Sequence, residues 1–125
     1  MTTIDTSKAS LELDSWVADC ILDLDREMIY LLDRRGQFIG YSPGLRDYSA
    51  AIVPAMEVVD KLIADGIRWG FGYDSVPSCF SIPDGDKWYA MLLENPIADF
   101  SNILAFADTL PLAICKALYK WKGEK

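Results

Sequence analysis

The chain contains no histidine, and that absence removes much of the usual chemistry of enzymes. Catalytic pairs of serine or cysteine with histidine need an imidazole, and most zinc and non-haem iron sites use histidine as a ligand. Carboxylates stand two residues apart at Asp23 and Asp25 and again at Asp84 and Asp86. Side chains at this spacing diverge on a helix or belong to a turn, so we interpret both pairs as solvated surface. We therefore expect a protein that is not an enzyme and has no catalytic residue, metal site or cofactor.

The three cysteines, Cys20, Cys79 and Cys115, lie far apart in the sequence and are odd in number. A free cysteine packs as a small apolar side chain, and none of the three stands at the spacing of a metal or redox motif. We expect all three to be reduced residues of the core.

Aromatic and arginine side chains are better suited to recognition than to reaction. A flat ring stacks on a ligand, and a guanidinium forms two parallel hydrogen bonds with a phosphate or carboxylate. Trp88 and Tyr89 offer further flat rings, although aromatic residues on strands usually serve the core. The candidate ligand-binding residues are Arg34, Arg35, Arg46, Tyr48, Arg68, Trp69 and Tyr73.

Length and composition indicate one domain over residues 1–125, of which residues 1–10 are expected to be flexible. About half of the 125 residues are hydrophobic, which is enough for a core without metal or disulfide support. The net charge of −7 opposes binding to nucleic-acid phosphates and anionic lipids. Residues 1–10 are polar, and no apolar run approaches the roughly 20 residues of a membrane span. We expect a cytoplasmic protein with neither a membrane nor direct nucleic-acid contacts.

The first half of the chain predicts two helices with a hairpin between them. Apolar residues at helical spacing after Ser10 predict a helix over residues 11–25. Residues 28–32 and 37–41 then form a hairpin around Gly36, or the first helix extends into residues 28–32. A second helix begins near Ala51, which places Pro54 in its first turn, and ends before Gly66.

The second half of the chain predicts a strand meander and a closing helix. Residues 67–73 alternate between an aromatic side and a side with Gly70 and Gly72, which predicts a strand. A helix, a subunit or a ligand can approach the glycine side closely, and we favour a helix. Residues 78–82 and 87–93 are further strands, and the apolar run 88–93 indicates burial on both faces. Residues 100–106 form an apolar connector, and a helix begins near Asp108 with Pro111 in its first turn. This order predicts an α+β domain with a mostly antiparallel sheet covered by helices.

Four segments together resemble the phage ABA sandwich domain, a small family encoded mainly by bacteriophages and prophages. They are Leu-Asp-Ser-Trp-Val-Ala-Asp at 13–19, Asp-Arg-Arg-Gly at 33–36, Tyr-Ser-Ala-Ala-Ile-Val-Pro-Ala-Met-Glu-Val-Val-Asp-Lys-Leu at 48–62, and Ala-Asp-Thr-Leu-Pro-Leu-Ala-Ile-Cys-Lys-Ala at 107–117. Ala50 and Ala51 depart from the usual threonine and aspartate of the family, and Met56 from its usual tryptophan. The resemblance implies a three-layer α/β/α sandwich of phage origin, and it implies no activity.

That origin leads us to expect a phage or prophage accessory protein that binds without catalysing a reaction. Its partner would be a host protein or a small nucleotide-like signal, its role would be to counter host defence, and its location would be the bacterial cytoplasm. The alternative is an acidic interaction protein that mimics nucleic acid, because the chain up to Asp33 holds eight acidic residues against two basic ones. Four tryptophans are many for a domain this small, so we expect a homo-oligomer.

Overall fold

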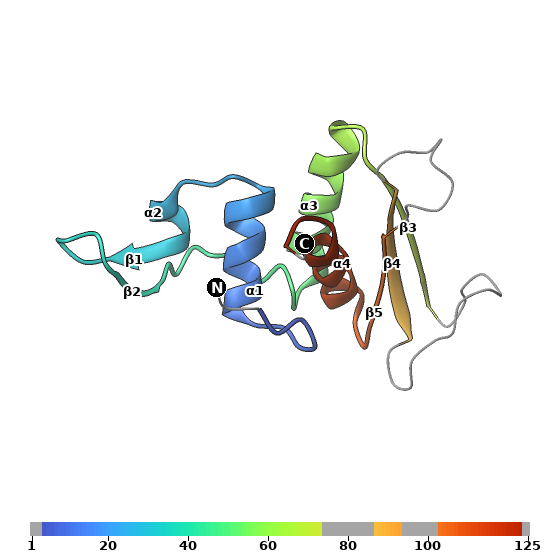
Figure 1. The fold of residues 1–125 in the computed structure, drawn as a ribbon, viewed down its shortest axis with the longest axis horizontal. Helices are drawn as coiled ribbons and strands as arrows, with labels where there is room; N and C mark the ends of the chain where they lie inside the picture. Colours follow the sequence, from blue (N-terminus) through green and yellow to red (C-terminus); the bar gives the residue numbers. More distant parts are fainter. Residues whose placement is uncertain (1–3, 74–86, 94–102, 124–125) are drawn as a thin grey trace.

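A computed structural model describes residues 4–73, 87–93 and 103–123 of the protein. Figure 1 shows a hairpin at one end, a three-stranded sheet at the other, and helices between them. The elements are α1 (Leu11–Trp16), the π-helix η1 (Val17–Ile21), α2 (Arg26–Ile29), β1 (Tyr30–Leu32), β2 (Phe38–Tyr41), α3 (Ile52–Ala64), β3 (Arg68–Tyr73), β4 (Trp88–Leu93), β5 (Ile103–Ala107), α4 (Leu110–Leu118) and the π-helix η2 (Tyr119–Gly123).

Both sheets are antiparallel, and consecutive strands pair with each other. β1 pairs with β2, and β4 lies between β3 and β5 in the larger sheet. Helix α4 packs on β4 and β5 and contacts α3, which also contacts β3 (Figure 1). The predicted α+β class, with an antiparallel sheet covered by helices, is therefore confirmed. The strand prediction for residues 78–82 lies outside the described residues, and residues 103–107 form strand β5 where we expected an apolar connector.

In the described part of the chain, helices cover one face of the larger sheet. The buried side chains of Ala90 and Leu92 belong to that face, and those of Tyr89 and Met91 on the other face are only half-buried. The expectation of burial on both faces is thus correct for one side of β4. The helix-facing side joins one continuous core with α1, η1, α3 and α4, centred on Leu13, Val17, Val58, Val59, Ile114 and Leu118.

The glycines of β3 make room for neighbouring side chains of β4, and in the part of the chain that the structure describes these side chains take the place where we expected a helix to pack. Gly72 pairs with Tyr89, and Gly70 pairs with Met91. A Cβ atom on Gly72 would overlap the Tyr89 ring, whereas one on Gly70 would lie 3.4 Å from the Met91 Cε atom. The bare backbone at Gly72 thus lets a tyrosine ring lie flat across the sheet.

The first helix is shorter than predicted, because it widens into a π turn and stops. The Leu22 N–H donates to the Val17 carbonyl, five residues back, at 3.1 Å. The last helical residue is Ile21, four residues before the predicted limit of 25, and Asp23 then adopts a positive φ of 52°. A π turn rotates less per residue than an α turn, so the residues after it shift around the axis. Cys20 is exposed as a result, which corrects its assignment to the core.

The other predicted boundaries agree closely with the structure. Helix α3 begins at Ile52, after Ala51, and Gly66 follows it with a φ of 95°. The hairpin turns at Gly36, whose φ is 78°, and the alternative of a longer first helix is excluded by β1. The first strand of the hairpin is shorter than the predicted 28–32, because residues 28 and 29 belong to the short helix α2 and β1 begins at Tyr30. Helix α4 is capped by Thr109, which accepts a hydrogen bond from the backbone of the first turn, and not by Asp108 as expected. Cys115 is buried in α4 as predicted, and Cys79 lies outside the described residues.

A buried carboxylate ties α1 to the segment before α3. Asp14 Oδ1 accepts hydrogen bonds from the Ser49 N–H at 2.8 Å and the Ser49 hydroxyl at 2.6 Å. The Ser10 N–H donates to Ser49 Oγ at 3.2 Å, and Ser10 Oγ caps α1 by accepting from the Leu13 N–H. Burial raises the pKa of the Asp14 carboxyl, while its bonds to Ser49 act in the opposite direction. These contacts fix the position of α1 beside α3.

Across the described ranges, we find no helix with the length and apolar character that crossing a bilayer demands.

We expect Gly72→Ala to destabilise the protein by about 1–3 kcal/mol, because the new methyl group forces the Tyr89 ring out of its position. Gly70→Ala is the matched control on the same strand and should cost clearly less. Urea unfolding followed by circular dichroism measures both free energies. Equal costs for the two variants would contradict the close approach of Tyr89.

Asp14 predicts a pH dependence of stability. The pKa of the Asp14 carboxyl is higher in the folded than in the unfolded chain, so the folded state binds this proton more tightly. The bound proton therefore stabilises the folded state at low pH, and this stabilisation is lost as pH rises through the folded pKa. Asp14→Asn keeps an acceptor for both Ser49 bonds and does not titrate. Wild type should therefore lose stability relative to Asp14→Asn between pH 3 and pH 7 in urea titrations. A difference that moves the other way would mean that the pKa of Asp14 is lowered.

Ser49→Ala is expected to lower the free energy of unfolding by about 1–3 kcal/mol at low pH. The Asp14 carboxyl loses one of its two hydrogen-bond donors in this variant while it stays buried. The same urea titrations measure this cost. A loss below the error of the measurement would show that water replaces the serine hydroxyl.

Candidate functional site

A pocket of about 330 Å³ lies between the first helix and the hairpin. Its floor is a stripe of the helix formed by Glu12, Ser15, Trp16 and Asp19. These positions are spaced by three and four residues, so they share one side of the helix while Leu13 and the buried residues around it face the core. The stripe continues from α1 into the π turn, where Asp19 and Cys20 stand at one end of the pocket.

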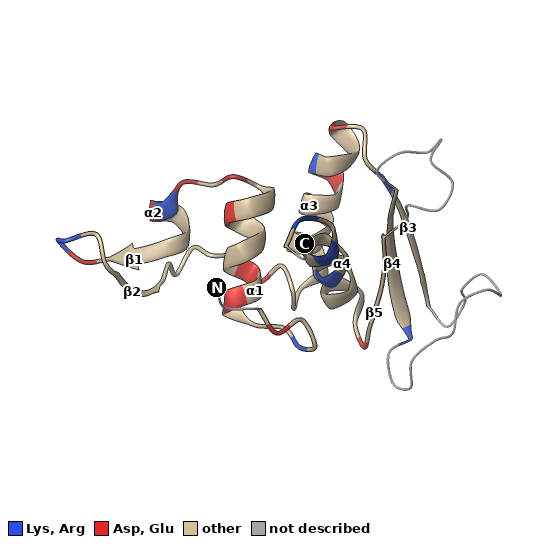
Figure 2. Ribbon diagram, viewed as in Figure 1, with Lys and Arg blue, Asp and Glu red and all other residues tan. Residues whose placement is uncertain are grey.

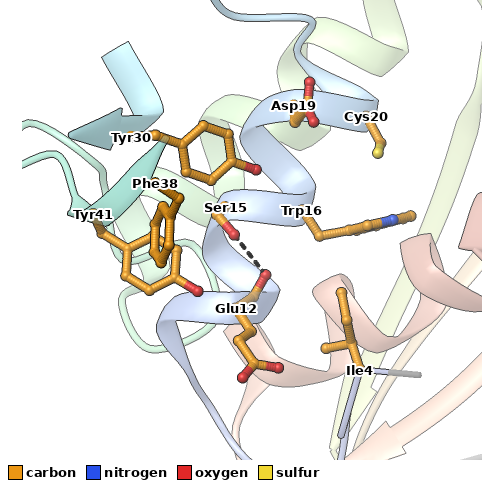
Figure 3. A pocket seen from close by; sticks show the side chains of 9 residues that line it. All are labelled: Ile4, Glu12, Ser15, Trp16, Asp19, Cys20, Tyr30, Phe38 and Tyr41. Atoms are coloured by element: carbon orange, nitrogen blue, oxygen red, sulfur yellow. Dashed lines mark hydrogen bonds between the residues drawn. The ribbon is translucent and has the colours of Figure 1, made fainter. Parts of the chain in front are cut away.

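Three aromatic rings of the hairpin form one wall of the pocket. Tyr30 lies on β1, and Phe38 and Tyr41 lie on β2. Their centroids are 5.8 Å apart for Tyr30 and Phe38 and 5.2 Å for Phe38 and Tyr41, both with edge-to-face geometry. Figure 3 shows the three rings together on one side of the helix. Because the rings hold one another, the wall is a preformed aromatic surface.

Trp16 and Ile4 form the opposite side of the pocket (Figure 3). The indole of Trp16 meets the ring of Tyr119 edge to face, with centroids 5.0 Å apart. The Tyr119 hydroxyl accepts a hydrogen bond of 3.3 Å from the Ile4 N–H. One tyrosine of η2 thus holds both the indole and the N-terminal segment in place.

The pocket carries negative charge and contains no activated nucleophile. Burial raises the pKa of the Cys20 thiol, and the neighbouring Asp19 charge raises it further. The pKa of Tyr30 is raised by the same two causes in the same order. Both groups therefore stay protonated near neutral pH, while Glu12 and Asp19 contribute carboxylates and no lysine or arginine lines the pocket. Such a lining can bind a cation or an apolar group with a positive end.

The arginines and the tyrosine expected to bind a ligand in the first half of the chain do not converge. Arg34 and Arg35 lie in the exposed turn between β1 and β2. Arg46 pairs with Glu57 of α3 at 3.1 Å. Tyr48 is only 3% exposed and belongs to the core, and burial raises its pKa.

The remaining expected residues lie on β3. Arg68 and Trp69 line a second hollow of about 510 Å³ at the end of α3. The Trp69 Nε1–H is buried and has no hydrogen-bond partner among the described residues, and its ring stacks on Phe71 at 5.7 Å. Tyr73 stands at the other end of the strand against Trp88, with centroids 4.9 Å apart. The seven expected residues thus fall in separate places and do not form one site.

The aromatic wall was missed because its members pair across a hairpin, and spacing along the chain does not reveal which face they share. The available signal was the concentration of Tyr30, Phe38 and Tyr41 on two short strands beside a helix with a polar stripe. Glu12 and Asp19 of that polar stripe both line the pocket. Among the described residues, no group of three or more acidic or cysteine side chains is arranged to hold a metal ion.

No protein-family model and no curated protein matches the sequence. The fold is similar to that of a solved structure described as a phage protein from Bacillus cereus ATCC 14579, with a TM-score of 0.58. The match covers 97% of this chain and 91% of that chain at 18% sequence identity. At this identity the similarity concerns the fold alone. The likeness to the phage ABA sandwich family therefore remains a resemblance of sequence segments.

Cys20 gives a direct measure of the charge in the pocket. In a Cys79→Ser background, iodoacetamide should alkylate Cys20 more slowly than a free thiol at pH 7.5, because the thiolate fraction is reduced. Asp19→Asn should raise this rate a few-fold, and Asp60→Asn on the exposed side of α3 should not change it. Peptide mass spectrometry follows the reaction and should find Cys115 unmodified in the folded protein. A Cys20 that reacts faster than a free thiol would contradict the assignment.

Proposed function

We propose that the protein is a phage-type accessory protein that acts by binding and that its partner is a host protein. The observation that carries this proposal is the pocket between α1 and the hairpin, with a preformed aromatic wall and two carboxylates. Aromatic surfaces of this kind supply binding energy at protein interfaces, and charged neighbours supply specificity. The phage assignment is supported by the fold shared with the Bacillus cereus phage protein.

A host protein is a better candidate partner than a small nucleotide-like signal. A nucleotide needs cationic groups near its phosphates, and the pocket presents Glu12 and Asp19 instead. The arginines that would suit a phosphate are separated, since Arg46 pairs with Glu57 while Arg34 and Arg35 stand at the hairpin turn. The nucleotide alternative is therefore kept as an arm of the test.

The proposal includes the setting in which the protein acts. We place it in the cytoplasm of a bacterial host, where binding to a host defence protein would block that defence. We also propose that the protein forms a homo-oligomer, which the exposed apolar side chains of α3 support: Ile52, Val53 and Ile63 are each about half exposed or more. Native mass spectrometry of the purified protein reports the assembly size directly.

A second candidate function is that of an acidic protein that mimics nucleic acid. Figure 2 shows acidic residues along α1, α2 and their connection, and basic residues gathered on α4 and the turns after it. Lys116 and Lys120 donate hydrogen bonds to the carbonyls of Phe106 and Leu104, so the basic side chains are held near β5 while the acidic ones lie on the other side of the core. Salt separates the candidates, because binding to an acidic mimic weakens strongly as ionic strength rises, whereas apolar binding in the pocket weakens little.

Affinity purification from bacterial lysate tests the proposal with a matched pair of variants. Phe38→Ala removes an exposed ring of the pocket wall, and Tyr73→Ala removes a similarly exposed ring on β3 that does not line the pocket. We expect wild type and Tyr73→Ala to retain the same host protein and Phe38→Ala to lose most of it, by quantitative mass spectrometry. A thermal-shift panel of cyclic and linear nucleotides should show no stabilisation. Retention of the host protein by Phe38→Ala, or a clear shift with a nucleotide, would contradict the proposal.

A further inference from the structure

The chemistry of the pocket specifies the part of the partner that enters it. Asp19 and Glu12 stand seven positions apart on the floor of the pocket, so about 10 Å of helix separates them. One cation can therefore pair closely with only one of the two carboxylates. Figure 3 shows Asp19 at the end of the helix stripe where the Tyr30 ring lies, and Glu12 at the other end. The charge of Asp19 accordingly contributes to the raised pKa of Tyr30.

The Tyr30 ring already attracts a guanidinium within this chain. The Cζ atom of Arg26, on the short helix α2, lies 5.6 Å from the centroid of that ring. This distance is within the range of a cation–π contact. Arg26 is not part of the pocket lining, so it does not fill the pocket itself. The aromatic wall and the carboxylate thus favour the same kind of group.

The surroundings of the pocket point to a protein as the source of that cation. Phe38 is 54% exposed, and Leu11, one helical turn before Ser15 on the floor, is 55% exposed. A free ammonium or guanidinium ion would leave both side chains in water. A basic residue carried by a protein segment brings its own methylene stem and neighbouring apolar residues, which cover them.

We infer that the pocket receives an arginine or lysine side chain of the partner protein, with its charged group between the Tyr30 ring and the Asp19 carboxylate. The inference rests on the proposed function, since it names the chemistry of the partner at the same site. The stem of the basic residue packs on the aromatic wall, and the flanking apolar residues of the partner cover Phe38 and Leu11. Glu12 adds to the negative potential and makes no direct pair with the same cation.

Titration with short peptides, followed by ¹⁵N–¹H NMR, tests the inference. The probes are acetyl-Leu-Arg-Leu-amide and the same peptide with citrulline, which keeps the shape of arginine without its charge. The indole signal of Trp16, identified by its loss in Trp16→Phe, reports on the pocket. We expect the arginine peptide to shift this signal and the hairpin amides, and the citrulline peptide to bind about 5- to 30-fold more weakly.

Protein variants locate the charge that matters. Asp19→Asn should weaken binding of the arginine peptide by about as much as citrulline does, Glu12→Gln should have a smaller effect, and the control Asp60→Asn on α3 should have none. Equal affinity for the two peptides would overturn the inference, as would shifts confined to other surfaces or no shift up to the solubility limit. The purification experiment with Phe38→Ala tests the proposed function without reference to arginine. If Phe38→Ala loses the host protein but the two peptides bind equally, the proposed function stands and only the inference about a basic side chain fails.

Discussion

The hydrogen bonds between Asp14 and Ser49 are the constraint on which the rest of the structure depends. A buried carboxylate must be satisfied by donors, and here one serine supplies both of them from a segment 35 residues away. The bonds fix the rotation of α1, so Leu13 and Val17 face the core. The opposite stripe is then left for the pocket. A polar contact in the core thus determines which side chains of the first helix line the pocket.

The π turn at the end of this helix has a similar consequence at the other end of the pocket. If the α-helix continued, Cys20 would stay on the side of the helix that faces the core, as its spacing from Leu13 and Val17 indicates. The wider turn moves it to the pocket beside Asp19. π turns are rare in helices and occur frequently at functional sites, where they change the direction of a side chain. Here the altered direction brings Cys20 into the pocket lining.

The sequence was most informative where a local rule decides the structure. Gly36 and Gly66 take the positive φ values that turns and helix ends require, and Pro54 lies in the first turn of α3. Local rules failed at the helix end after Ile21 and at strand β5, where contacts across the fold decide the structure. The candidate site failed for the same reason. The sequence analysis assigned stacking and phosphate binding to single aromatic and arginine residues. The pocket instead forms where a polar stripe of the first helix faces aromatic rings of two strands, and spacing along the sequence does not reveal that these elements meet.

The two ends of the molecule differ in how firmly they are held, and this difference argues for recognition at the hairpin. At the sheet, Tyr89 lies across Gly72, and Lys116 and Lys120 donate hydrogen bonds to carbonyls of β5 at 3.0 and 3.1 Å. The hairpin has no such cover from α3 or α4, and its contacts are mainly with α2. The rings of the hairpin hold one another instead, through the edge-to-face contacts of Phe38 with Tyr30 and Tyr41. The aromatic wall is therefore formed in advance by contacts within the hairpin, while few other elements pack around it.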